Sequence, residues 1–492
     1  MAASGGLAGS SLIAVSLFDA IMLPPRFSRA LEGQGARTPQ ASGVLCMAIV
    51  AGTLTMLLTG SAEAQPLRDE RAPETNASTR PADTQRPNPA PTTTFSDQWP
   101  IGRNWLRARG VDIAAGYVSE AAGNVAGGAR ERARETGQFT LGATLDMERL
   151  VGLRGGKLQA TATYRRGADL GAAADLGVLQ QVQEVYGRGQ TLRLTQLWYQ
   201  QSLDGEHVDI KLGRLTMGED TAAFSCQFMN LSFCGSPPGN LVGDYWYNWP
   251  VSQWAARARV HDARFYATAG IYESNPRNLD NVFALGYFHG AKGVILPGEV
   301  GFTPRVGARG LPGAYKYGAW YNTANADDVE LDVNRGRRAV TGLAPLRRDG
   351  RYGFFLQIQQ QLTGEAAAGP QGPRTKRGLV AFANYTQTDP QTSRVDSQLA
   401  FGVFYTGLFD ARLDDDFGFA FARTHVNARA VSAIPAGKTE RPDSEYATEI
   451  FYGVHVVSWL ILRPNVQLVV DPGGYGNADA VVILGMKSAV TF

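Results

Sequence analysis

The last twelve residues alternate between apolar and mixed positions with a period of two. In VVILGMKSAVTF, every second residue counted back from Phe492 is apolar except Ser488, and the opposite parity is mixed. A strand places these two sets on opposite faces. One apolar and one mixed face over about ten residues, ending in an aromatic residue, is typical of the last strand of a membrane barrel. A soluble edge strand shows the same pattern, so this segment alone leaves both alternatives open.

The same alternation recurs through most of the chain. It is repeated in Gln138–Glu148, Lys157–Arg165, Trp254–Val260, Tyr352–Leu362 and Trp459–Asp471. A soluble barrel needs only a small apolar core, whereas this pattern extends over close to 400 residues, which fits a barrel in lipid better. At about 24 residues per strand, the sequence predicts an all-β fold, a transmembrane antiparallel β-barrel of about 16 strands over residues 111–492. The polar parity is then expected to line a water-filled channel.

The front of the chain contains an apolar, uncharged stretch, Gly43–Gly60, with arginines before it and the small-residue pattern Ala62-Glu63-Ala64 after it. This order is that of a secretory signal peptide. We therefore expect residues 1–64 to be a signal peptide with a long n-region, and a later start, for example at Met22, is the alternative to Met1. The alternative is a retained anchor, since a stretch of about 18 residues is borderline for crossing a bilayer.

Two short segments follow the predicted signal peptide. Residues 65–98 are rich in Pro, Thr and Asn and are expected to form a disordered periplasmic segment, because they contain too few large apolar side chains to form a core. Residues 99–110 (WPIGRNWLRARG) are expected to form a short periplasmic helix. The net charge of +2 argues against a nucleic-acid partner.

One long segment breaks the alternation, between Gly213 and Trp254. In a wide barrel, such a segment is expected to fold inward as a long loop and to narrow the channel. It contains Cys226 and Cys234, and in an oxidising compartment a disulfide between them is the favoured interpretation over a metal pair or free thiols. Arg214 shares the parity of its apolar neighbours, and a charge on the lipid face costs about 2–4 kcal/mol. We therefore expect a kink at Gly213 that turns Arg214 inward.

This segment resembles the carbohydrate-selective porins of the OprB family. The matching segments, spread over roughly residues 99–492, are LGRL (Leu212–Leu215), GED (Gly218–Asp220), the two cysteines, YNWPVSQW (Tyr247–Trp254), ERLVGLRGGK (Glu148–Lys157), GAWYNT (Gly318–Thr323) and LRPNVQLVVDPGG (Leu462–Gly474). One departure is Thr221, since the family often has Phe after the GED aspartate. The resemblance implies a 16-stranded outer-membrane barrel through which sugars diffuse.

Sugars offer hydroxyl groups that donate and accept hydrogen bonds, and apolar C–H faces. Arginine supplies several donors, carboxylates accept pairs of hydroxyls, and aromatic rings cover the C–H face. The residues expected at the constriction and in sugar binding are Arg165, Arg214, Glu219, Asp220, Trp246, Trp249, Arg257, Arg259, Glu445, Glu449 and Arg463. The alternative is that these charges only solvate the wall and pair with one another, and that the aromatic residues pack the folded loop.

The expected function is passive, carbohydrate-selective diffusion of glucose-like mono- or oligosaccharides across the cell outer membrane. A general diffusion porin without sugar preference is the alternative. No enzyme is expected, since none of the five histidines lies in a nucleophile motif and no G-x-S-x-G occurs. No cofactor or metal is expected either. The expected partners are carbohydrate solutes, outer-membrane lipid and the barrel assembly machinery, with the protein as a monomer or a trimer.

Overall fold

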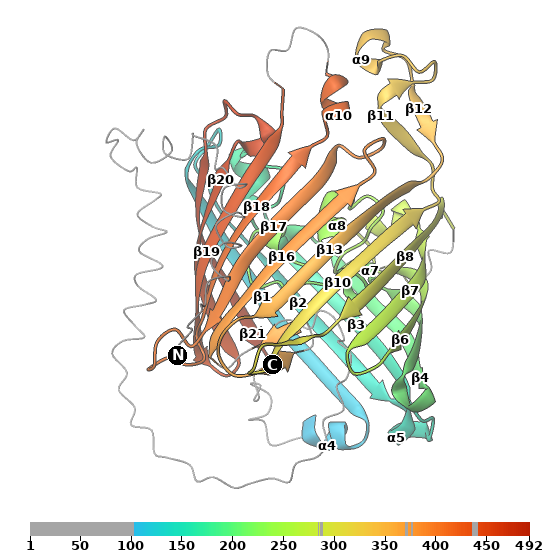
Figure 1. Ribbon diagram of the computed structural model, residues 1–492, viewed down its shortest axis with the longest axis vertical. Helices are drawn as coiled ribbons and strands as arrows, with labels where there is room; N and C mark the ends of the chain where they lie inside the picture. The colour runs from blue at the N-terminus through green and yellow to red at the C-terminus, as the bar shows by residue number, and fades with distance from the viewer. Residues whose placement is uncertain (1–102, 284, 286–288, 370–371, 375–376, 435–440) are drawn as a thin grey trace, which may run out of the picture. The chain divides into compact units, whose positions relative to one another are not determined.

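The computed structural model describes residues 103–492 except 284, 286–288, 370–371, 375–376 and 435–440 (Figure 1). The predicted signal peptide and Pro-rich segment, residues 1–98, lie outside the described residues. A short helix, α4 (Arg103–Ala108), lies within the range of the predicted N-terminal helix, 99–110. Among the described residues, no helix is long and apolar enough to cross a lipid bilayer.

Most of the described strands form one large antiparallel sheet that closes on itself. Its 16 long strands are β1 (Val111–Ala126), β2 (Ala133–Asp146), β3 (Gly156–Gly167), β4 (Leu192–Leu203), β5 (Val208–Leu215), β6 (Gln253–His261), β7 (Phe265–Ser274), β8 (Gly293–Phe302), β10 (Leu311–Asn322), β13 (Arg351–Gln361), β16 (Gly378–Thr388), β17 (Val395–Thr406), β18 (Asp416–Val426), β19 (Ser444–Val457), β20 (Leu460–Val470) and β21 (Val481–Thr491). Each pairs with the next, and β21 pairs with β1, with Val490 opposite Tyr117. This closure leaves no free sheet edge and confirms the predicted barrel.

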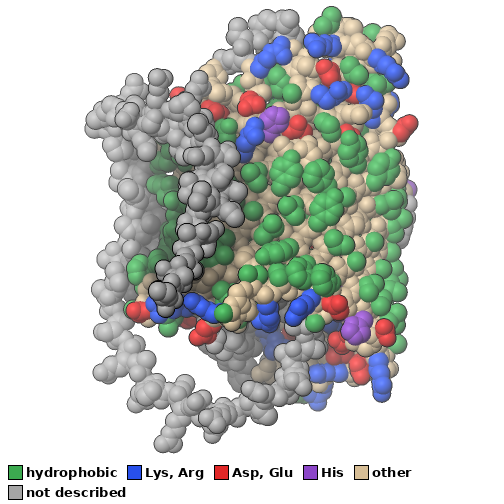
Figure 2. All heavy atoms as spheres, in the orientation of Figure 1, with side chains coloured by type: hydrophobic (Ala, Val, Ile, Leu, Met, Phe, Trp, Pro, Cys, Tyr) green, Lys and Arg blue, Asp and Glu red, His purple; other side chains and the backbone are tan. Residues whose placement is uncertain are grey.

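Side chains along the strands alternate between the outer and the inner face of the wall. On β13, Leu356 is 41% exposed and the next residue, Gln357, is 2% exposed. On β20, Val466 is 47% exposed and Gln467 is fully buried. Figure 2 shows hydrophobic side chains in a broad band over the strands, with charged side chains gathered above and below it. An apolar outer band with charged margins is the surface that a bilayer requires.

One predicted strand ends earlier than the alternation indicated. The strand predicted over Gln138–Glu148 stops at Asp146, whose carboxylate accepts hydrogen bonds from the backbone N–H groups of Glu148 and Arg149 at 3.1 and 3.2 Å. A side-chain acceptor at this position caps the first turn of a helix. Met147 and Glu148 therefore begin the helix α5 (Met147–Val151) instead of extending the strand.

Most of the connections at one end of the barrel are longer than those at the other. The elements in the shorter connections are α5, η3 (Asp204–Glu206), β9 (Arg305–Val306), β14 (Ala367–Gly369) and β15 (Gly372–Arg374). The elements in the longer connections are α6 (Leu170–Ala174), η2 (Glu184–Tyr186), α7 (Met217–Asp220), η4 (Leu231–Phe233), α8 (Pro237–Leu241), η5 (Pro276–Leu279), β11 (Ala326–Asp332), α9 (Arg338–Thr341), β12 (Pro345–Arg348), α10 (Ala428–Ser432) and η6 (Pro472–Gly474). The pairs β11–β12 and β14–β15 form two small sheets separate from the large one. In barrels of this class the longer connections face the cell exterior.

Candidate functional site

Two of the long connections lie against the inner face of the wall. Inner connection 1 (residues 168–191) joins β3 to β4, and inner connection 2 (residues 216–252) joins β5 to β6. They contact each other through two backbone hydrogen bonds, from Leu231 N to the Gln181 carbonyl at 2.8 Å and from Glu184 N to the Met229 carbonyl at 2.9 Å. The two connections are therefore held together as one layer.

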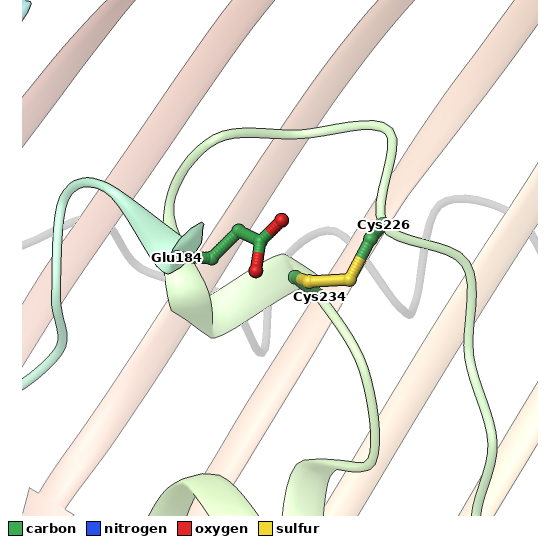
Figure 3. Close-up of side chains that lie close together, drawn as sticks. All are labelled: Glu184, Cys226 and Cys234. Carbon is green, nitrogen blue, oxygen red and sulfur yellow. A yellow bond between two sulfur atoms is a disulfide. The ribbon is translucent and has the colours of Figure 1, made fainter. Parts of the chain in front are cut away.

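Inner connection 2 contains the predicted disulfide between Cys226 and Cys234. Figure 3 shows Glu184 of inner connection 1 beside it. The carboxylate and the two sulfur atoms lie within 4.8 Å of one another. Metal binding by cysteine requires thiolates, and the sulfurs are bonded to each other, so this cluster offers no thiolate ligand in the disulfide form.

Aromatic side chains attach inner connection 2 to the wall. Phe228 is fully buried, and its ring lies 5.0 Å from that of Phe451, 5.3 Å from that of Phe404 and 6.2 Å from that of Phe382 (centroid distances). These three phenylalanines belong to β19, β17 and β16 and point to the inner side. The predicted polar inner face is therefore wrong for this part of the wall, because inner connection 2 covers it and needs an apolar partner.

Two carboxylates predicted to contact sugars instead hold the connections. Glu449 accepts hydrogen bonds from the backbone N–H groups of Met229 and Asn230 at 2.8 and 2.7 Å. Glu445 accepts from Leu179 N at 2.6 Å and from Gly473 N at 2.9 Å. Both carboxylates are buried, and a buried N–H group without an acceptor destabilises the fold. Glu445 and Glu449 therefore act as anchors for backbone donors.

Glu219 and Asp220, which were also predicted to lie at the constriction, contact side chains of the wall. Asp220 lies 2.8 Å from the Lys211 ammonium group and 3.6 Å from the Arg257 guanidinium, and accepts a hydrogen bond from the Tyr272 hydroxyl at 3.0 Å. Burial alone would raise the pKa of the Asp220 carboxyl, but Lys211 and Arg257 together hold that pKa below its ordinary value. Glu219 accepts a hydrogen bond from the Gln196 amide at 2.7 Å. Arg257 is therefore an anchor of inner connection 2.

The two predicted tryptophans lie in different surroundings. Trp246 is fully buried and packs at 5.1 Å, edge to face, on Trp320, while its indole N–H donates to the Ser236 hydroxyl. Trp246 therefore packs inner connection 2 against the wall. These contacts give it a structural role in place of the predicted stacking on sugars. Trp249 is only half-buried, and its indole N–H donates to Gln138 of β2 at 3.1 Å.

Arg214 and Arg259 are placed in the wall. Gly213 has φ = +134°, and Arg214 after it is 2% exposed and donates to the Ser252 carbonyl at 2.7 Å and to Asn278 at 3.1 Å. A Cβ at Gly213 would lie 2.3 Å from the Leu197 carbonyl oxygen, which explains why glycine is needed at this bend. Arg259 is half-buried, with its guanidinium 3.9 Å from the ring centre of Tyr266.

A cavity of about 330 Å³ remains between the two inner connections and the wall. That volume is in the range of sites that bind small molecules, about 300–1,000 Å³. Of the predicted site residues, Arg165, Trp249 and Arg463 line it, together with both cysteines. Arg165 donates to Gln138 at 2.8 Å, and Arg463 pairs with Asp416 at 2.9 Å.

Several residues that line this cavity escaped the sequence analysis. Inner connection 1 contributes Gln181, Glu184 and Arg188, and inner connection 2 contributes the amides Asn240 and Asn248. Residues 168–191 lack the alternation of the strands, just as residues 213–253 do. The same criterion would therefore have identified inner connection 1.

Comparisons with known proteins agree with this architecture. The model of the family described as "Carbohydrate-selective porin, OprB family" matches residues 130–492. "Porin B" of Pseudomonas aeruginosa is 40% identical over 427 residues, which cover 81% of this chain and 92% of that protein. The "Putative porin QuiX" of Acinetobacter baylyi is 30% identical over 427 residues, covering 80% of this chain and 93% of that protein.

Among solved structures, the one described as "High pH structure of Pseudomonas putida OprB" superimposes with a TM-score of 0.76 at 39% sequence identity. The match covers 82% of this chain and 99% of that one. The family match, the relatives and the closed 16-stranded barrel all lead to the same assignment. The chain belongs to the OprB family of carbohydrate-selective porins of the outer membrane.

Proposed function

We propose that this porin lets glucose-like sugars diffuse passively into the periplasm through the cavity between its inner connections and the wall. The lining of that cavity is the observation that carries the proposal. It combines the guanidinium groups of Arg165 and Arg463, the amides of Asn240 and Asn248, and the indole of Trp249. Guanidinium and amide groups match sugar hydroxyls, and an indole ring matches the C–H face of a sugar.

Passage requires that each contact be weak, because a site that binds tightly retains its ligand. The lining meets this requirement, since its donors and acceptors are spread over the wall and two connections. The anchors described above support the proposal, because they fix the position of the connections relative to the wall. Held in this way, the lining groups keep a fixed spacing for the hydroxyl groups of a sugar, whereas the alternative function, a general diffusion porin, needs no such lining.

Besides the sugar, the proposed partners are outer-membrane lipid and the barrel assembly machinery. The outer surface of the barrel and the C-terminal residue support them. The apolar outer band is suited to outer-membrane lipid. Phe492 N donates to the Ala115 carbonyl at 3.0 Å, and the Phe492 ring lies 6.4 Å from that of Phe139 on the outer face of β2. We propose that the assembly machinery recognises this aromatic end.

Block of single-channel current by D-glucose tests the proposal. In planar bilayers, glucose is expected to reduce the potassium chloride current of the wild-type protein, because a sugar in the cavity occupies the ion path. Trp249→Ala is expected to raise the half-blocking concentration about fivefold, the equivalent of about 1 kcal/mol. Trp105→Ala is the matched control, since Trp105 lies on α4, 56% exposed. Current that glucose does not block in the wild-type protein would favour the general porin.

A further inference from the structure

Cations outnumber carboxylates in the lining of the cavity. The lining contains four cations, Arg165, Arg188, Arg463 and Lys487. It contains one carboxylate, that of Glu184. Three of these cations have carboxylate partners. Arg463 pairs with Asp416 at 2.9 Å, Lys487 pairs with Glu120 and Glu184 at 3.0 Å each, and Arg165 lies 3.9 Å from Glu184.

Arg188 differs from the other three cations. Within the part of the chain that the structure describes, its side chain makes one hydrogen bond, to the Gly239 carbonyl at 3.5 Å, and no ion pair. The nearby carboxylate of Asp244 pairs with Arg351 instead. A guanidinium group has five N–H donors in a planar fork, so most of the donors of Arg188 remain open to a solute in the cavity.

The surrounding chain is shaped to hold this side chain. Arg188 has φ = +72°, a left-handed conformation that large residues rarely adopt, and such strain occurs preferentially at functional sites. Arg193 stabilises the turn by donating to the Arg188 carbonyl at 3.1 and 2.7 Å. A Cβ at Gly243 would lie 2.1 Å from Nη2 of Arg188, so a larger residue at this position would displace the guanidinium from its place in the cavity wall. Desolvation lowers the pKa of Arg188, yet an arginine stays protonated at neutral pH.

We infer that the cavity also admits sugars that carry a carboxylate, namely aldonates and uronates, and that Arg188 binds the carboxylate. This inference rests on the proposed function, because the charged sugar takes the same path as the neutral one. A carboxylate accepts two parallel N–H bonds from a guanidinium fork, which adds direction to the electrostatic attraction. The amides of Asn240 and Asn248, which line the same cavity, remain available for the sugar hydroxyls. Arg188 is half-buried and not fully buried, so the pairing stays weak enough for release.

The probes for this inference are D-glucuronate and D-glucose, which differ only in the oxidation state of C6. Half-blocking concentrations are measured for both on single channels of the full-length protein in dilute potassium chloride. In the wild-type protein, glucuronate is expected to block at a concentration about fivefold lower than glucose, as one partly exposed ion pair predicts. In Arg188→Gln, the ratio of the two concentrations is expected to fall to about one. Arg154→Gln is the control, since the Arg154 side chain is 92% exposed at the opposite end of the barrel.

The possible outcomes separate this inference from the proposed function. If glucose blocks and glucuronate blocks no better, or if Arg188→Gln keeps the preference, the inference is overturned and the sugar channel stands. If neither solute blocks, the proposed function itself fails. The wild-type protein offers a second test that needs no variant. At about 1 M salt the Debye length falls to about 3 Å, so the preference for glucuronate should weaken relative to dilute salt, and a preference that does not fall with salt overturns the inference.

Discussion

The ammonium group of Lys211 on β5 lies 2.8 Å from the carboxylate of Asp220, nine residues further along the chain at the start of inner connection 2. The side chains are only 8% and 5% exposed. This contact ties the beginning of the connection to the strand from which it leaves. Together with the anchor at Glu449, it fixes both the start and the middle of inner connection 2 on the wall.

Asp220→Asn is expected to destabilise the protein, because it leaves Lys211 and Arg257 buried without a counter-charge. Removing one partner of a buried ion pair typically lowers the free energy of unfolding by about 3–5 kcal/mol. Thermal unfolding of the purified barrel in detergent measures the effect. Asp204→Asn is the matched control, because Asp204 is exposed in the turn after β4. Equal stability of the two variants would contradict the anchoring role of Asp220.

The contact between Asp220 and Lys211 should resist acid. A carboxyl whose pKa is lowered on folding contributes stability above its unfolded pKa, and that stability is lost as the pH falls through the folded pKa. The pKa of Asp220 lies below its ordinary value, so its contribution should be complete above about pH 4 and lost only in more acidic solution. Hydrogen exchange of residues 216–225, compared between Asp220→Asn and the wild type from neutral to acidic pH, measures this. A difference already lost near neutral pH would refute the expectation.

Reduction of the disulfide should alter conductance more than barrel stability. Cys226 and Cys234 line the cavity, whereas the barrel is held by the 16 strands and their pairing. We expect a reducing agent to change the single-channel current of the wild type and to leave its thermal unfolding nearly unchanged. The double variant Cys226→Ser, Cys234→Ser is the control, because the reagent should have no effect on it. A large loss of stability without a change in current would show that the disulfide serves the wall instead.

Deletion of Phe492 should prevent assembly in the outer membrane. The residue ends the strand that closes the barrel against β1, and its ring lies on the outer face. The appearance of a heat-modifiable band in outer-membrane fractions measures assembly. Phe409→Ala serves as a control, since Phe409 is a 55% exposed phenylalanine in the connection between β17 and β18. Normal assembly after deletion would count against recognition of the terminal aromatic residue.

The wall could be predicted from the sequence because alternation is a local property. Whether Leu356 or Gln357 faces outward follows from the parity of the strand alone. The inner layer depends instead on contacts between residues distant in the sequence, such as the hydrogen bond from Met229 to Glu449 across 220 residues. Parity correctly placed Glu449 on the inner face, but it could not indicate that a backbone segment, and not a sugar, would meet it there.

The same limit explains why one of the two predicted tryptophans packs inside the fold and the other lines the cavity. Trp246 and Trp249 are three residues apart in one irregular segment, and their composition and spacing do not distinguish them. Trp246 is buried because Trp320 of β10 and Phe355 of β13 lie opposite it, whereas Trp249 borders the cavity beside Gln138. Only the path of inner connection 2 in space separates a packing residue from a lining residue.

Liposome swelling tests sugar selectivity most directly. Proteoliposomes that contain the wild-type protein are placed in D-glucose and, separately, in a zwitterionic amino acid of similar mass. The account predicts faster swelling in glucose, because the amide and indole groups of the cavity match the hydroxyl groups and the C–H face of a sugar, whereas the ammonium group of the amino acid is repelled by the surplus of cations in the lining. Equal swelling rates would contradict it and identify a general diffusion porin.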